Sequence, residues 1–365
     1  MKKILVSLLF CLSFLSIKSF GFPDMIRHGY VNCTACHISP SGGGVLNTYG
    51  RSLSKELLST WSYEKEENIL HGLVDTEKVN DWLAIGGDFR GAQVHVNNDQ
   101  VTRGKFIKMQ SGIELGVNLE KFALIGFIGE YRKEEWLANA PRYYGLYRFT
   151  DIASLKVGRY LPNFGINIPD HILATRGPLG FGYGAESDGA EVSVLSDNWA
   201  WTGSYFLTPQ EKSTLNNKGF ATTASLVFNA KNKVTLQYYS EKDDIRKKSV
   251  YGINGLLGWS EKLYTTVEFD QSSTELNSST TVTKGNYITH KSGYELTKGF
   301  HALILNDYFQ SDIDNGATKV YKYGPGIQWY PRPHLDIQLY WTKLQTAQNV
   351  EREGDYAWMI LHYYL

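Results

Sequence analysis

Two cysteines and a histidine form the most chemically specific group in this 365-residue chain. They stand as Cys33-Thr34-Ala35-Cys36-His37, the C-x-x-C-H spacing at which haem c is attached covalently. Thiols three positions apart can both reach the vinyl-derived carbons on one edge of a porphyrin, and the adjacent imidazole can take an axial position on the iron. The motif therefore predicts one covalent haem c, with Cys33 and Cys36 as thioether sites and His37 as the proximal ligand. A disulfide between the two cysteines and a zinc site with two further ligands are the alternatives.

A haem in this segment also requires a sixth iron ligand and partners for its propionates. His28 is the first candidate for the sixth position because it belongs to the same short arm. Met25, His71 and a vacant position are the alternatives. Arg27 and Arg51 are candidates to pair with the propionates, whose planar carboxylates suit a guanidinium fork.

The first 21 residues predict a cleaved export signal of the Gram-negative type. Two lysines precede an apolar stretch from Ile4 to Ile17, and Ser19 and Gly21 stand as the small residues before a cleavage site. Export agrees with the motif, since covalent haem attachment takes place outside the cytoplasm. We expect residues 22–81 to form a small monohaem segment with a spacer, in which Ser52 caps a short helix that extends to Trp61.

From residue 82 to the C-terminus the sequence alternates with a period of two, in stretches of about ten residues. Between Ile107 and Leu119, for example, all but one of the odd positions are apolar and all the even ones are polar or glycine. This pattern predicts strands with one apolar face. We expect about sixteen, with fourteen or eighteen as alternatives, starting near Trp82, Lys105, Phe122, Arg142, Ile152, Gly189, Trp199, Gly219, Lys233, Ser249, Leu263, Tyr287, Phe300, Lys319, His334 and Asp355.

Three features favour a transmembrane antiparallel β-barrel over a soluble sandwich. The strand count is even, and abrupt junctions at 229–232, 259–262 and 330–333 alternate with longer polar connections such as 272–285, as periplasmic turns alternate with external loops. The alternation also continues to the last residue, Leu365, as in barrels whose last strand closes on the first. Aromatic residues near the expected strand ends predict interfacial girdles: Trp199, Trp201, Trp259, Trp329, Tyr330 and Trp341.

The composition excludes several other classes of protein. Lysine and arginine together number 37 and so do the acidic residues, so no basic surplus indicates a nucleic-acid partner. The only long apolar run lies in the export signal, which excludes a bundle of membrane-spanning helices. No nucleophile triad, phosphate-binding loop or paired metal-carboxylate motif indicates bond-making catalysis. We therefore predict an all-β chain whose barrel, residues 82–365, lies in the lipid of the outer membrane.

The order of these elements resembles a known family. A Phe22-Pro23 start, Arg27 and Gly29 before the C-x-x-C-H motif, one haem site and then a barrel are similar to the outer-membrane monohaem porin–cytochrome c fusions of iron-oxidising bacteria. The resemblance covers the whole chain in architecture, but only residues 22–37 at the level of motifs. It implies that the haem segment plugs or caps the barrel and passes electrons from extracellular ferrous iron to periplasmic electron carriers. The glycine-rich run from Ser39 to Gly44 departs from that family.

The sequence thus predicts an electron-transfer protein rather than a bond-making enzyme. The main alternative is a porin for small solutes, in which the haem segment acts as a plug, gate or redox sensor. A haem enzyme such as a peroxidase is a third interpretation, which requires a vacant sixth position. A lumen filled by residues 22–81 would favour electron transfer, whereas an open pore with the haem outside it would favour the porin. The glycine-rich stretch between 158 and 188 predicts either a constriction loop or an ordinary external loop.

Overall fold

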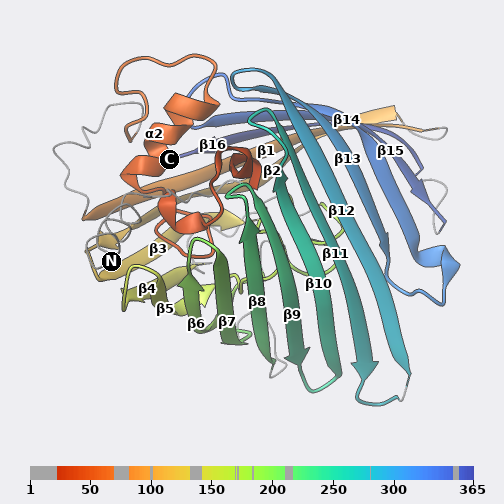
Figure 1. Ribbon diagram of the computed structural model, residues 1–365. Helices are drawn as coiled ribbons and strands as arrows, with labels where there is room; N and C mark the ends of the chain where they lie inside the picture. The colour runs from red at the N-terminus through yellow and green to blue at the C-terminus, as the bar shows by residue number, and fades with distance from the viewer. Residues whose placement is uncertain are drawn as a thin grey trace, which may run out of the picture.

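The computed structural model describes residues 23–69, 82–98, 102–131, 142–168, 170, 172–182, 185–209, 217–279, 281–347 and 353–365. Within these residues, sixteen antiparallel strands close into one barrel, and each strand pairs with its sequence neighbours (Figure 1). The predicted all-β barrel of about sixteen strands is confirmed. The strands are β1 (Leu83–Asn97), β2 (Thr102–Asn118), β3 (Phe122–Tyr131), β4 (Tyr143–Arg148), β5 (Ala153–Tyr160), β6 (Ser187–Leu195), β7 (Trp199–Leu207), β8 (Lys218–Phe228), β9 (Asn232–Lys242), β10 (Arg246–Gly258), β11 (Leu263–Leu276), β12 (Val282–Thr297), β13 (Phe300–Gln310), β14 (Lys319–Trp329), β15 (Leu335–Thr346) and β16 (Gly354–Tyr364).

The barrel closes where its last strand pairs with its first. β16 runs antiparallel to β1 and places Tyr364 opposite Asp88. Leu365 continues the ladder, since its N–H donates to the carbonyl of Gly87 at 2.9 Å. The prediction that the chain ends in a closing strand is therefore confirmed.

The alternation of side chains sorts the wall into an apolar outer face and a polar lumen. In β2, Ile113 and Leu115 are 42% and 44% exposed, whereas Glu114 between them is 1% exposed. Successive side chains of a strand point to opposite faces, so the aliphatic residues meet lipid and the carboxylate faces the lumen.

A β-bulge interrupts this alternation in β2. The register between β1 and β2 shifts at Arg90 and Gly91, and Met109 turns inward to a buried cluster that contains Trp358. An extra residue reverses the side-chain parity on one side of a bulge. The prediction of unbroken alternation between Ile107 and Leu119, which places Met109 on the lipid face, is therefore wrong at this residue.

The connections at the two ends of the barrel differ. Short turns that include the predicted junctions near 230, 260 and 331 gather at the end where β1 starts and β16 finishes. In barrels of this class short turns face the periplasm, so we name this the periplasmic end and the opposite one the external end. The polar stretch 272–285, predicted as a long connection, is mostly strand, because β11 continues to Leu276 and β12 already begins at Val282.

The aromatic side chains follow the girdle prediction only in part. Trp199 and Trp259 are exposed at the periplasmic end. Trp341 is exposed too, but it lies in the middle of β15. Tyr330 is 2% exposed, and its hydroxyl lies 2.6 Å from Nε2 of Gln328 inside the barrel, so the prediction of a girdle position is wrong for this residue.

The N-terminal residues 23–61, which we call the plug, lie in the periplasmic mouth of the barrel (Figure 1). They contain η1 (Pro23–His28), η2 (Cys33–Ala35), α2 (Thr48–Leu53) and η3 (Ser54–Leu58). The predicted helix starts earlier than expected: Asn47, not Ser52, is its cap, because its side chain accepts the N–H of Gly50 at 2.8 Å. No helix in the described part of the chain is long and apolar enough to span a bilayer.

Candidate haem site in the periplasmic mouth

A buried ion pair attaches the start of the plug to the barrel. Arg27 is fully buried, and its Nη1 lies 2.5 Å from a carboxylate oxygen of Glu295 on β12. The same nitrogen donates to the carbonyl of Glu261 in the turn between β10 and β11 at 3.0 Å. These partners hold η1 against the wall.

The opposite side of the plug is attached near β1 and β16, the two strands that close the barrel. Arg51 of α2 donates to the carbonyl of Ile85 on β1 at 3.3 Å. The Ser54 hydroxyl lies 3.0 Å from the hydroxyl of Tyr364 on β16 and accepts the N–H of His334 at 2.8 Å. The plug therefore contacts both sides of the mouth.

Glycines on the wall allow the plug backbone to approach closely. A Cβ on Gly258 would lie 2.7 Å from Cα of Arg27, and one on Gly86 would lie 3.0 Å from Cα of Val45. Both distances are shorter than the normal contact between two carbon atoms. These two positions fix how deep the plug sits, because a side chain at either would collide with the main chain.

The C-x-x-C-H residues form a tight turn inside the plug. The N–H groups of Cys36 and His37 both donate to the carbonyl of Cys33, at 3.2 and 2.9 Å. Asn47 clamps the turn from the other side, since its side-chain amide donates to the carbonyl of Ala35 at 2.7 Å and its N–H donates to the carbonyl of Cys36 at 2.8 Å. One asparagine thus caps α2 and fixes the motif.

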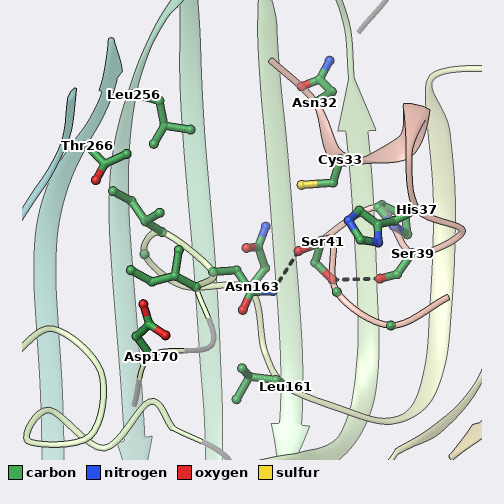
Figure 2. A pocket seen from close by; sticks show the side chains of 18 of the residues that line it. Asn32, Cys33, His37, Ser39, Ser41, Leu161, Asn163, Asp170, Leu256 and Thr266 are labelled. Carbon is green, nitrogen blue, oxygen red and sulfur yellow. Dashed lines mark hydrogen bonds between the residues drawn. The ribbon is translucent and has the colours of Figure 1, made fainter. Parts of the chain in front are cut away.

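The motif opens onto a cavity of about 280 Å³ in the lumen. Figure 2 shows the Cys33 thiol and the His37 ring among the side chains that line it. Cys36 is buried beside them in an apolar cluster with Met25 and Leu46. Desolvation raises the pKa of the Cys33 thiol, which favours its neutral form.

The donor set and its surroundings fit a covalent haem. Cys33 and Cys36 are both free thiols rather than a disulfide, and Cys33 and His37 line the same space. Where the plug backbone runs next to the Cys33 thiol, the residue is a glycine, Gly42. Its φ is +74°, and a Cβ added to it would lie 3.0 Å from the sulfur of Cys33. This left-handed glycine keeps the space beside the thiol free of side-chain atoms.

The predicted sixth ligands lie away from this cavity or outside the described residues. His28 is half-buried in η1, where burial and the neighbouring Arg27 lower its pKa. Met25 packs in the cluster that contains Cys36, and His71 lies outside the described residues. The cavity wall does include an imidazole that the sequence analysis did not select, His362, which bonds to Asp88 at 2.8 Å.

The predicted propionate partners, Arg27 and Arg51, are both buried in the contacts between plug and wall, and neither lines the cavity. Their role toward a haem stays a prediction. The guanidinium groups that do line it belong to Arg90 and Arg142, and Arg142 pairs with Glu114 at 2.8 Å. Glu114 is one of the polar even positions between Ile107 and Leu119, but nothing in the sequence links it or Arg90 to the motif.

The glycine-rich connection between β5 and β6 folds into the lumen as a constriction loop. Arg176 donates to the carbonyl of Phe164 at 2.9 Å and holds the loop together. The N–H of Ile166 donates to Glu268 on β11 at 2.9 Å, so the loop reaches the far wall. Asn167 then donates to the carbonyl of Ser41 in the plug at 2.9 Å. The loop from the external end and the plug from the periplasmic end therefore touch.

Comparison with known proteins identifies the fold. No protein-family model and no curated protein matches the chain. Among solved structures it is similar to a loop L8 deletion mutant of OmpT, an outer membrane protein of Vibrio cholerae (TM-score 0.60, 9% identity, 78% of this chain and 99% of that one). An anion-selective porin from Comamonas acidovorans (0.59, 8%, 78% and 99%) and OprB of Pseudomonas putida (0.57, 9%, 80% and 96%) are also similar. The fold is that of an outer-membrane β-barrel, in agreement with the predicted location.

Proposed function

We propose that this chain binds one haem c in its plug and transfers electrons in the outer membrane, from an external donor such as ferrous iron to periplasmic electron carriers. One observation carries the proposal: the C-x-x-C-H turn lies inside the mouth of the barrel, with Cys33 and His37 facing a cavity in the lumen. The resemblance to monohaem porin–cytochrome c fusions supports it, because a plugged barrel is the arrangement which that resemblance implies.

In this proposal the residues of the chain attach, orient and shield the cofactor. Cys33 and Cys36 would hold a haem and His37 would ligate its iron, so that the bound group supplies one-electron chemistry. The Asn47 clamp fixes the turn that carries all three residues. Burial together with nearby hydrogen bonds would set the reduction potential.

The barrel acts as a sleeve that holds the redox group at one depth. The hydrocarbon layer is about 25–30 Å thick, which is more than a single haem spans. A periplasmic carrier and an external donor therefore have to reach the plug and the loop from the two sides. The aromatic pair of Trp61 and Trp329, whose ring centroids lie 5.7 Å apart, is exposed in part at the periplasmic end, where such a carrier arrives.

The test is to produce the full chain together with the cytochrome c maturation machinery and to extract it from membranes. We expect a haem stain that survives denaturing electrophoresis, a c-type reduced-minus-oxidised spectrum and reduction by added ferrous iron. A C33A/C36A variant is the control, and it should lack the stain. Absence of the stain from the wild-type protein would exclude the cytochrome. A stained protein that ferrous iron fails to reduce would exclude this donor.

A second candidate function is a porin whose plug acts as a gate. The observation in its favour is that the similar structures include a protein titled an anion-selective porin and one titled an outer membrane channel, DcaP of Acinetobacter baumannii. Conductance in planar bilayers separates the two functions. A porin should conduct ions as the full chain, whereas the electron-transfer protein should conduct appreciably only after residues 23–61 are deleted.

A further inference from the structure

One wall of the lumen cavity carries a single charge. The strands β6 to β11 contribute eleven described residues to its lining, and Lys233 is the only charged residue among them. The others are aliphatic, aromatic or polar without charge: Leu195, Ala200, Thr202, Thr223, Ser225, Thr235, Asn254, Leu256, Tyr264 and Thr266. Lys233 is the second residue of β9, close to the periplasmic turn and to the plug.

The ammonium of Lys233 has no carboxylate partner in the described residues. This ammonium donates to the carbonyl of Val31, two residues before Cys33, at 3.0 Å. The other cations of the cavity differ: Lys156 pairs with Glu191 at 2.7 Å, and Arg142 pairs with Glu114. Arg90 lies 3.2 Å from a ring nitrogen of His362, which bonds in turn to the carboxylate of Asp88 at 2.8 Å. A lysine ammonium has three donors, so Lys233 keeps capacity for a further acceptor.

Lys233 is partly withdrawn from water. An ammonium in that position without a counter-charge is unfavourable, and an anion that enters the cavity removes the imbalance. The neighbouring wall supplies hydroxyls that can donate to the same anion: the Ser225 and Thr235 hydroxyls lie 2.9 Å apart beside Lys233. Lys291 also lines the cavity, but Asp24, Asp170 and Asp336 already act on it electrostatically. The open positive site is thus at Lys233.

We propose that Lys233 is the cation of a carboxylate site in the lumen cavity, and that a propionate of the haem carried by Cys33 and Cys36 occupies it. This proposal rests on the proposed function and replaces Arg27 and Arg51 as the expected partners. The residue lies on the barrel wall, so a bound cofactor would add one more link between the plug and the wall. A free carboxylate from the periplasm is the other source of the same chemistry.

A positive charge beside the haem stabilises the reduced form, because reduction lowers the net charge of the group by one. Replacing Lys233 with methionine in the haem-loaded full chain is therefore expected to shift the reduction equilibrium about tenfold toward the oxidised form, which is about 59 mV for one electron. K233R keeps the cation and should keep the wild-type potential. K248M is the matched control, because Lys248 donates to the carbonyl of Leu179 in the lumen but does not line the cavity.

A spectroelectrochemical titration measures these potentials, and a second experiment identifies the source of the carboxylate. In that experiment calorimetry follows succinate binding to the haem-free C33A/C36A protein with and without K233M. A K233M potential equal to that of wild type and K248M would overturn the propionate assignment, and succinate binding that depends on Lys233 would then assign the site to free carboxylates. No effect in either experiment would overturn the site itself. A wild-type protein without haem stain would instead refute the proposed function, and the succinate experiment would still test Lys233.

Discussion

Replacing Gly258 with alanine is expected to destabilise the docked position of the plug without removing any charge or hydrogen bond from the plug. Gly258 is the last residue of β10, and the plug backbone passes directly over it. The added methyl carbon would lie 2.7 Å from Cα of Arg27 and 2.9 Å from the carbonyl oxygen of Ile26. Carbon atoms in contact normally lie about 3.5–4.0 Å apart, so the plug has to move.

The size of the effect follows from the atoms involved. The Cα of Arg27 and the carbonyl oxygen of Ile26 are both main-chain atoms, so no side-chain rotation relieves their overlap with the added methyl group. Overpacking of this kind costs about 1–3 kcal/mol, and the docked state bears the whole cost because the undocked plug does not touch Gly258. The equilibrium between docked and undocked plug is therefore expected to shift about 5- to 150-fold.

The thiol of Cys36 reports this equilibrium in haem-free protein. Cys36 is 2% exposed while the plug is docked, so a water-soluble maleimide reaches it only after undocking. In a C33A background the labelling rate of G258A should rise by the same 5- to 150-fold. G255A on the same strand is the control, since its methyl group would meet only side-chain atoms at 3.4 Å or more. Equal labelling rates of Cys36 in G258A and G255A would refute the close contact between Gly258 and the plug backbone.

Three further predictions concern the plug and the loop. Deleting both thiols (C33A/C36A) should abolish the haem stain but leave a folded barrel with normal heat-modifiable migration, because Cys33 and Cys36 lie outside every strand; a barrel that fails to fold would contradict this. Arg176→Met should free the constriction loop, since breaking a buried charged contact costs about 3–5 kcal/mol, and limited proteolysis should then cut the loop faster than in wild type. Asn47→Ala removes a helix cap worth about 1 kcal/mol, so Cys36 labelling should rise about fivefold; an unchanged rate would exclude the clamp.

The strands were predictable because each one has to show an apolar face to lipid and a polar face to the lumen. This requirement imposes the period of two wherever the wall crosses the membrane. It does not act where a strand extends beyond the lipid, and there the prediction failed. β12 was expected near Tyr287 but begins at Val282, because residues 283–286 are polar or glycine on both faces and look like a loop.

The site was predictable only where its chemistry lies in consecutive residues. The C-x-x-C-H motif marks Cys33 and His37 by sequence alone. His362 and Asp88 are 274 positions apart and meet because β16 closes on β1. Lys233 is one of many polar residues at lumen positions, and its lack of a counter-charge depends on which wall faces the plug. No local pattern encodes either relation.

The contact between plug and constriction loop bears most directly on the choice between the two functions. Asn167 of the loop donates a hydrogen bond to the carbonyl of Ser41 in the plug. The hydroxyl of Ser41 also accepts a hydrogen bond from the ammonium of Lys156 on β5, at 2.6 Å. For a solute channel this junction lies in the lumen that solutes have to cross, so it narrows their path while the plug is docked. For electron transfer the same junction is an advantage, because it helps to hold the plug, and with it the redox group, at a fixed depth. The contact between plug and loop therefore agrees with the proposed electron transfer as long as the plug stays docked, and the rate of Cys36 labelling measures that directly.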